Sequence, residues 1–246
     1  MDFDKGAFGS EDVSTFDVDV RHGFIRKVYG ILTIQLLVTF GMVSLFSFNG
    51  DVQKVVLTND WPIYTALGVS FAALIAIVCC GNNARIYPRN YILLSIFTLA
   101  EGYLVGVISA QYAMQPGDGY GTVAMAMGAT FVVVLGLSLF ACQTKYDFTG
   151  MGGYLFAFLL TLILFGFMAT LFTSTYEQVK TVNVVYSSLG VLLFAFYIVY
   201  DTQLIVGGKH KKYQYGVDDY VFAALSLYLD VINMFLYILA LMGNRN

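Results

Sequence analysis

Seven long apolar stretches occupy most of this 246-residue chain, and they decide what it can fold into. They lie at residues 28–48, 61–80, 91–113, 120–142, 153–173, 183–206 and 219–242. Each is about 20 residues long, which is the length an α-helix needs to cross the hydrocarbon core of a bilayer. Only 12% of the residues are charged, against about 25% in an average soluble domain. The sequence therefore predicts an all-α integral membrane protein with a seven-transmembrane-helix bundle.

The connections between these stretches are short, so they leave no room for a second folded domain. We predict one membrane domain over residues 21–246. Residues 1–20 are acidic and contain Gly and Ser, which predicts a disordered tail. This tail has neither a basic start nor a short apolar core, so we expect no cleavable signal peptide.

The basic residues indicate an orientation. Of the 13 basic residues, Lys54, Lys180 and Arg245 fall on one side of the predicted membrane and all the others on the opposite side. Because basic residues collect on the cytoplasmic side, the N-terminus and the even-numbered loops are predicted to be cytoplasmic. The net charge of −3 is too small to indicate a nucleic-acid partner, and we expect none. The lipid bilayer is the expected surrounding.

Three acidic residues lie inside the apolar stretches, namely Glu101, Asp201 and Asp230. A charge in hydrocarbon costs about 2.5–3.5 kcal/mol, so such residues usually face a partner or water. At 1.5 Å per residue, Glu101 and Asp230 lie roughly 15 Å and 16 Å from the predicted cytoplasmic ends of their spans, and Asp201 roughly 8 Å from that end of its own span. Straight helices would leave the two aspartates at different depths. Helix tilt, or a break near Gly207 and Gly208, is needed to bring them together.

Helical spacing nevertheless puts the two aspartates on polar faces. Ser226, Asp230, Asn233 and Tyr237 share one face of the last span, and Asp201 shares a face with Ser187 and Tyr197. We predict that the aspartates face each other. Since two close carboxylates do not both ionise cheaply, the pair would share a proton and titrate as a unit. When fully ionised it would bind a cation, and calcium prefers such oxygen ligands.

A plainer interpretation stays open for each of these acids. Asp201, Asp230 or Glu101 could hydrogen-bond to a neighbouring helix and only hold the bundle together. Asp218 and Asp219, at the mouth of the last span, are candidates for a cation-attracting vestibule. Acidic residues at a helix N-terminus are also favoured by the helix dipole alone. Glu101, Asp218, Asp219 and Asn233 are therefore secondary candidates along an ion pathway.

Three segments resemble one known family. They are FIRKVYGIL at residues 24–32, YDTQL at 200–204 and DDYVFAALSLYLDVIN at 218–233. They are similar to the Bax inhibitor/Lifeguard family, also called the transmembrane Bax inhibitor motif family. The start IRKVY and the GGKH that follows the sixth span favour the Lifeguard branch.

The resemblance implies a bundle of the Bax inhibitor type with the last helix central. It also implies a pH-sensitive calcium leak that lowers stored calcium and suppresses cell death. The family's paired aspartates map onto Asp201 and Asp230, and its acidic position before the last helix maps onto Asp218 or Asp219. The resemblance implies no enzymatic activity and no cofactor beyond the transported calcium. Expected partners are protons, calcium, cell-death regulators or calcium-release channels, in an endoplasmic reticulum, Golgi or endolysosomal membrane.

Parts of the pattern also resemble other membrane functions. Intramembrane aspartyl proteases carry Tyr-Asp on one span, as at Tyr200 and Asp201, but their second aspartate follows Gly-x-Gly. Here Asp230 follows Leu-Tyr-Leu, whose bulk disfavours access by a peptide. A proton-coupled transporter stays open as the alternative, because buried acids serve proton relays as well as channels.

Overall fold

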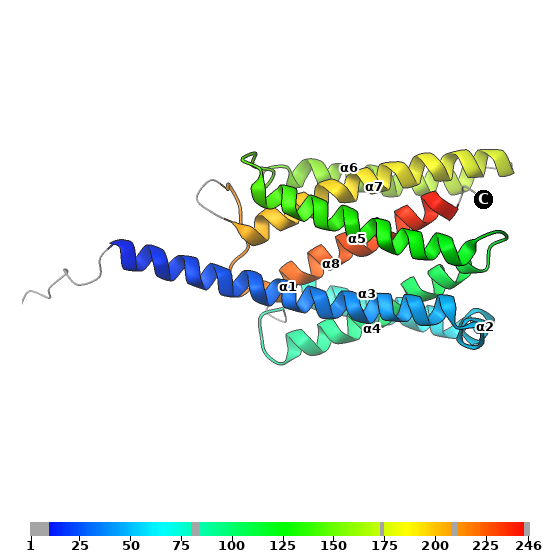
Figure 1. Ribbon diagram of the computed structural model, residues 1–246, viewed down its shortest axis with the longest axis horizontal. Coiled ribbons are helices and arrows are strands. Elements are labelled where there is room, and N and C mark those ends of the chain that lie inside the picture. Colours follow the sequence, from blue (N-terminus) through cyan, green and yellow to red (C-terminus); the bar gives the residue numbers. More distant parts are fainter. Residues whose placement is uncertain (1–9, 80–83, 173–174, 208–210, 244–246) are drawn as a thin grey trace, which may run out of the picture.

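The computed structural model describes residues 10–79, 84–172, 175–207 and 211–243, with side chains in the first helix from residue 19 on. These residues form eight α-helices (Figure 1). Seven of the helices are long and apolar enough to cross a membrane, which confirms the predicted all-α fold. The helices are α1 (Ser10–Phe48), α2 (Gly50–Thr58), α3 (Trp61–Val78), α4 (Arg89–Ala113), α5 (Gly119–Gln143), α6 (Gly152–Phe172), α7 (Tyr176–Val206) and α8 (Tyr220–Gly243).

Each predicted span corresponds to one long helix, and two features differ from prediction. The short helix α2 was not predicted; its start is capped by Asn49, whose side-chain oxygen accepts hydrogen bonds from the N–H groups of Asp51 and Val52. Helix α1 begins at Ser10, inside the stretch predicted as a disordered tail (1–20), so residues 10–20 are helical. Residues 1–9 of that stretch lie outside the described residues. The single membrane domain over 21–246 stays a prediction.

The last helix lies at the centre of the bundle. Helix α8 packs against α1, α4, α5 and α7, whereas α3 packs mainly on α4 and α6 on α7. Figure 1 shows α8 running obliquely between these neighbours. Its side chains Tyr228, Met234 and Phe235 are fully buried. The resemblance implied this central place for the last helix, and the packing confirms it.

Close approach between α7 and α8 depends on a glycine. A Cβ atom at Gly190 would lie 2.5 Å from the ring of Tyr237. That ring stacks on Phe194, with centroids 5.7 Å apart. Since any side chain at Gly190 would push this ring aside, the glycine allows the two helices to lie close enough for their polar faces to meet.

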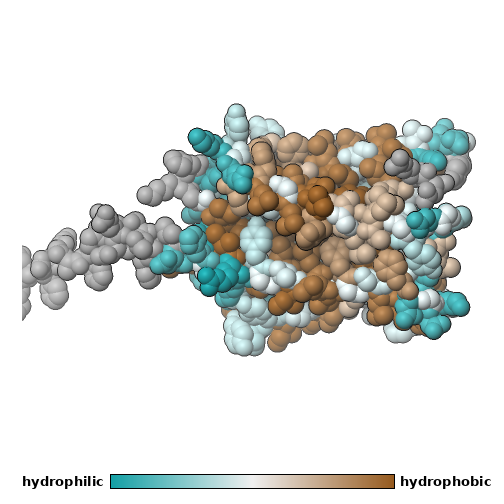
Figure 2. Space-filling view, viewed as in Figure 1, coloured by the Kyte–Doolittle hydropathy of each residue, from teal (hydrophilic) through white to brown (hydrophobic). Residues whose placement is uncertain are grey.

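The outside of the bundle is suited to lipid. Figure 2 shows a broad band of hydrophobic residues across the middle of the visible face, with hydrophilic residues at both ends. Large apolar side chains such as Phe156, Phe167 and Leu171 are exposed. A soluble monomer rarely exposes so much contiguous apolar surface. The chain is a multi-pass membrane protein.

We call the end of the bundle where α7 ends and α8 begins the proximal end. Helix α7 ends at Val206 and is followed by Gly207, whose φ of +63° is a conformation that favours glycine. A Cβ there would collide with the side chains of Gln214 and Arg21. The chain therefore turns tightly at this point and returns across the proximal end toward α8.

Candidate functional site

The two aspartates that the sequence singled out meet in the bundle core. Asp201 on α7 and Asp230 on α8 are each only 5% exposed. Their carboxyl groups lie within hydrogen-bonding contact of each other. Both helices are continuous through these residues, so no break is needed to bring them together. The oblique course of α8 (Figure 1) supplies the tilt that straight, parallel helices would lack.

A tyrosine from the connection between α7 and α8 completes the site. The Tyr215 hydroxyl donates a hydrogen bond of 3.4 Å to Oδ1 of Asp201 and also interacts with Ser226 on α8. Oδ2 of Asp230 is buried and has no hydrogen-bond partner among the described residues. A buried carboxyl oxygen without a donor is costly. The site thus holds one partnered acid and one with an open acceptor position.

Basic residues surround the proximal end without reaching the pair. Arg21 binds backbone carbonyls, Lys27 lies over the ring of Tyr220 at 3.4 Å, and Arg85 pairs with Asp219. Within the described part of the chain, the Arg85–Asp219 contact is the one ion pair. Neither Asp201 nor Asp230 is neutralised by a basic side chain there. A proton or a mobile cation is left as the compensating charge.

Glu101 lies in a separate polar cluster. It accepts a hydrogen bond of 2.9 Å from the Ser70 hydroxyl, which joins α4 to α3. Close by, the Tyr228 hydroxyl hydrogen-bonds to Thr39 of α1 at 2.7 Å. The structure therefore gives Glu101 a hydroxyl partner and not a second acid.

The remaining candidates do not contact the pair. Asn233 donates to the carbonyl oxygen of Leu229 in its own helix. Asp219 accepts a 2.7 Å hydrogen bond from Nε of Arg85, while Asp218 is exposed beside it. Of these two acids, Asp219 forms the ion pair and Asp218 does not. Their part in ion passage stays a prediction.

The predicted calcium ligands are few. In the described residues no group of three or more His, Cys, Asp or Glu side chains could hold a metal ion. Calcium takes about 6–8 oxygen ligands, and Asp201 and Asp230 supply carboxylate oxygens only. The donors fit a passing, partly hydrated calcium better than a tightly held one. Binding of calcium by the pair stays a prediction.

The loops at the proximal end are tied to one another. The Asp147 carboxylate accepts hydrogen bonds from Thr149 and from the backbone N–H of Lys212. Burial raises the pKa of Asp147, but these hydrogen bonds and the charge of nearby Lys211 lower it by more. The pKa of Asp147 therefore lies below its ordinary value. Gln203 of α7 donates to the carbonyl oxygens of Ala141 and Tyr146. The segment that carries Tyr215 is thus fastened to the loop between α5 and α6.

Sequence reasoning missed Tyr215 and Arg21. Tyr215 lies in a polar connection, where a tyrosine carries no pattern that distinguishes it from any surface residue. Arg21 counted only as one of the basic residues that set the orientation. The hydrogen bonds of Arg21 to Leu204 and Tyr215 join residues more than 180 positions apart in the sequence, which no local pattern reveals.

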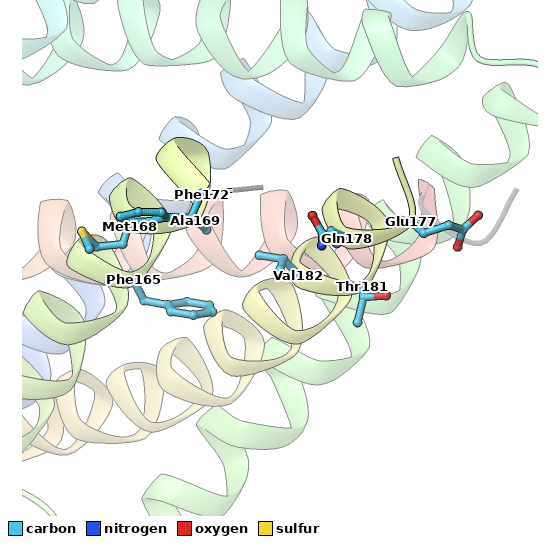
Figure 3. A pocket seen from close by; sticks show the side chains of 8 residues that line it. All are labelled: Phe165, Met168, Ala169, Phe172, Glu177, Gln178, Thr181 and Val182. Atoms are coloured by element: carbon cyan, nitrogen blue, oxygen red, sulfur yellow. The ribbon is translucent and has the colours of Figure 1, made fainter. Parts of the chain in front are cut away.

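A hollow between two neighbouring helices carries no such chemistry. It has a volume of about 560 Å³ and lies between the end of α6 and the start of α7 (Figure 3). Its lining is mostly apolar, and Figure 3 shows Glu177 at its edge, away from Phe165 and Met168. Val182 in this lining lies roughly 28 Å along α7 from Asp201. The hollow is therefore separate from the aspartate pair.

Comparison with known proteins gives concordant matches over nearly the whole chain. The sequence model of the family described as "Inhibitor of apoptosis-promoting Bax1" matches residues 21–246. Human Protein lifeguard 3 is 36% identical over 230 residues, which cover 94% of this chain and 71% of that protein. The mouse Protein lifeguard 3 is 35% identical, with 94% and 72% covered. The mouse Protein lifeguard 4 is 35% identical over 231 residues, with 92% and 87% covered.

Proposed function

Because this chain belongs to the Bax inhibitor family, in its lifeguard branch, we propose that it is a pH-sensitive calcium leak channel gated by Asp201 and Asp230. The observation that carries the proposal is the contact between two buried carboxyl groups that no basic side chain of the described residues neutralises. The packing of a stable bundle does not require such a pair.

Electrostatics supplies the gate. Two unit charges about 4 Å apart repel each other by about 4 kcal/mol where the effective dielectric constant is about 20. With one proton between them, Asp201 and Asp230 instead form a hydrogen bond that joins α7 to α8. A shared proton therefore holds the two helices together, and loss of that proton pushes them apart.

The ionised pair is also a cation site. Oδ2 of Asp230 has no donor among the described residues, so it offers a free acceptor to an entering ion. Calcium accepts carboxylate and water oxygens in a flexible geometry. Calcium flux should accordingly rise as the pH increases through the range in which the shared proton is lost.

The membrane in which the protein acts and the effect of the leak on the cell belong to the same proposal. We infer an intracellular membrane of the endoplasmic reticulum, Golgi or endolysosomal system, with the proximal end facing the cytoplasm. The excess of basic residues at that end supports this orientation. A leak there lowers stored calcium, which is how the protein would suppress cell death. Cell-death regulators or calcium-release channels are the proposed protein partners.

Calcium flux into liposomes that contain the purified protein tests the proposal across pH 5–8. Wild type is compared with Asp201→Asn, with Asp230→Asn and with Asp51→Asn, an exposed acid on α2 that serves as the control. Wild type and the control should show flux that rises with pH, whereas each pair variant should change that pH dependence. Absence of flux from wild type at every pH would overturn the leak. A profile that ignores both pair variants would remove the gate from Asp201 and Asp230.

A proton-coupled transporter is the second candidate, and Glu101 favours it. Glu101 is a third acid inside the bundle, hydrogen-bonded to Ser70 and apart from the pair, and it offers a second protonation site. The two functions differ in coupling. A leak dissipates a calcium gradient without a counter-substrate, whereas a transporter saturates and requires exchange. Measuring proton movement against calcium movement in the same liposomes separates the two.

A further inference from the structure

Tyr215 occupies the proximal side of the aspartate pair. Its hydroxyl reaches Oδ1 of Asp201 at 3.4 Å and interacts with Ser226 of α8. Its ring packs edge-on against Phe222, with centroids 6.0 Å apart. The side chain therefore touches both helices that carry the pair, at the end from which an ion would approach or leave.

The backbone of Tyr215 is fixed on both sides. Its N–H donates to the carbonyl oxygen of Leu204 at 3.1 Å. Its own carbonyl oxygen accepts a hydrogen bond of 2.7 Å from Nη1 of Arg21. A connecting loop would normally leave these groups to water. Here they attach Tyr215 to the last turn of α7, one turn beyond Asp201.

Arg21 holds this arrangement together from α1. Besides Tyr215, its guanidinium donates to the carbonyl oxygens of Leu204 at 2.7 Å and Val206 at 3.1 Å. It also lies over the Phe24 ring, 4.8 Å from the centroid. The last carbonyl groups of a helix lack intrahelical partners and attract cations. The planar guanidinium carries donors on three nitrogens in a fixed fork, and here each nitrogen donates to a different carbonyl oxygen.

We infer that Tyr215 is a positioning residue for the Asp201 carboxyl group, and that Arg21 fixes Tyr215 in place by binding the three carbonyl oxygens around it. The inference deepens the proposed function and rests on it, since it assigns to that gate the residues that set its operating pH. Tyr215 acts on Asp201 by donating a hydrogen bond, which favours the ionised carboxylate.

The donor persists over the whole relevant pH range. Burial, followed by the charge of Asp201, raises the pKa of Tyr215 above its ordinary value, so the hydroxyl keeps its proton. The other groups near the pair leave this assignment unchanged. They are Tyr197 and Tyr200 on α7 and Tyr29 on α1. Tyr29 hydrogen-bonds to Thr202, beside Asp201, and interacts with Cys142 of α5. Glu101 on α4 belongs to the Ser70 cluster.

The direct test is Tyr215→Phe, which removes the hydroxyl and keeps the ring. Tyr213→Phe is the matched control, because Tyr213 lies in the same connection and is 53% exposed. Two readouts are taken on the full-length protein. One is the pH of half-maximal calcium flux in liposomes. The other is the pH midpoint of the Asp201 carboxyl carbon resonance in protein labelled with ¹³C-aspartate, assigned with Asp201→Asn.

Tyr215→Phe should move both midpoints to higher pH by up to about one unit, given the usual strength of a single hydrogen bond. Tyr213→Phe should leave both unchanged. Arg21→Gln should move the midpoints in the same direction as Tyr215→Phe, and adding it to Tyr215→Phe should produce little further shift.

The outcomes separate the two proposals. Suppose that neither wild type nor any variant carries calcium, but Tyr215→Phe still shifts the midpoint of the Asp201 resonance. The positioning role then stands, and the calcium leak is overturned. If flux depends on pH but neither midpoint moves in Tyr215→Phe, the leak stands and the positioning role is overturned. A resonance that moves equally in Tyr213→Phe and Tyr215→Phe would also overturn it.

Discussion

The buried pair Asp201 and Asp230 and the partly buried Glu101 lie on different sides of the central helix, and they differ in what partners the acid. On the α7 side, Asp230 meets a second acid, Asp201. On the α3 and α4 side, Glu101 meets the Ser70 hydroxyl at 2.9 Å. A hydroxyl accommodates either protonation state of a carboxyl group by rotating its O–H. A second carboxyl group cannot, since it repels the first once both are ionised.

This difference teaches which buried acid is able to switch a helix contact. A change of protonation at Glu101 alters one hydrogen bond between α3 and α4. The same change at Asp201 and Asp230 replaces attraction by repulsion between α7 and α8. All three acids lie inside apolar spans of the sequence, so sequence position alone would have ranked them together, and the partner decides the role.

The largest expected effect comes from removing the pair altogether. Asp201→Asn with Asp230→Asn should abolish the pH dependence of calcium flux, because neither amide titrates. Glu101→Gln should keep the wild-type midpoint within experimental error. Flux profiles measured side by side in liposomes check this. Loss of pH dependence in Glu101→Gln, with retention in the double variant, would reverse the comparison.

A smaller effect is expected from adding a methyl group at two helix contacts, the one between α7 and α8 and the one between α4 and α1. Gly190→Ala places a Cβ 2.5 Å from the Tyr237 ring, whereas Gly102→Ala places one 3.0 Å from Sδ of the flexible Met42 side chain. Overpacking costs about 1–3 kcal/mol, so Gly190→Ala should lower the thermal unfolding midpoint more than Gly102→Ala. Gly128→Ala, which meets open space, is the control. Equal loss in all three variants would contradict the packing argument.

A weaker effect again is expected at the Glu101 cluster. Ser70→Ala removes one hydrogen bond, worth about 0.5–1.5 kcal/mol, and should lower the unfolding midpoint slightly. The pH of half-maximal flux should not change, since the pair is untouched. A shift of that midpoint in Ser70→Ala would mean that Glu101 and the aspartate pair are coupled through α8, and Glu101 would then not be independent of the gate.

The smallest effect is expected from the ion pair at the start of α8. The hydrogen bond and charge of Asp219 raise the pKa of Arg85 further, so the guanidinium stays charged throughout pH 5–8. Arg85→Gln should therefore leave the pH midpoint unchanged and alter flux by no more than about twofold, at low salt only. Flux measured at low and high ionic strength checks this. A large change in calcium flux that persists at high salt would contradict the expectation that this exposed ion pair has little influence on the channel.

The sequence was enough for the spans and for the two aspartates, for physical reasons. Bilayer thickness sets the length of an apolar helix, and an acid inside such a stretch stands out against it. Residues 201 and 230 could be identified in this way before any contact was known. Helix α2 was not predicted because its nine residues have mixed polarity and resemble a loop.

Three-dimensional packing supplied the rest. The depth estimate separated Asp201 from Asp230 because it assumed straight helices along the membrane normal, and the oblique α8 removes that difference (Figure 1). Tyr215 and Arg21 are joined to the site through backbone carbonyls, which every residue carries. No residue pattern marks which carbonyl a distant arginine will bind.

The central claim is that two buried carboxyl groups titrate as one unit. Infrared titration of protonated carboxyl groups tests this most directly. The titration is done in a Glu101→Gln background, so that Glu101 contributes no carboxyl signal from inside the bundle. Two separated steps are expected in the otherwise unchanged protein, and one step after either Asp201→Asn or Asp230→Asn. A single step at one pH, the same with both aspartates present and with either replaced, would contradict it.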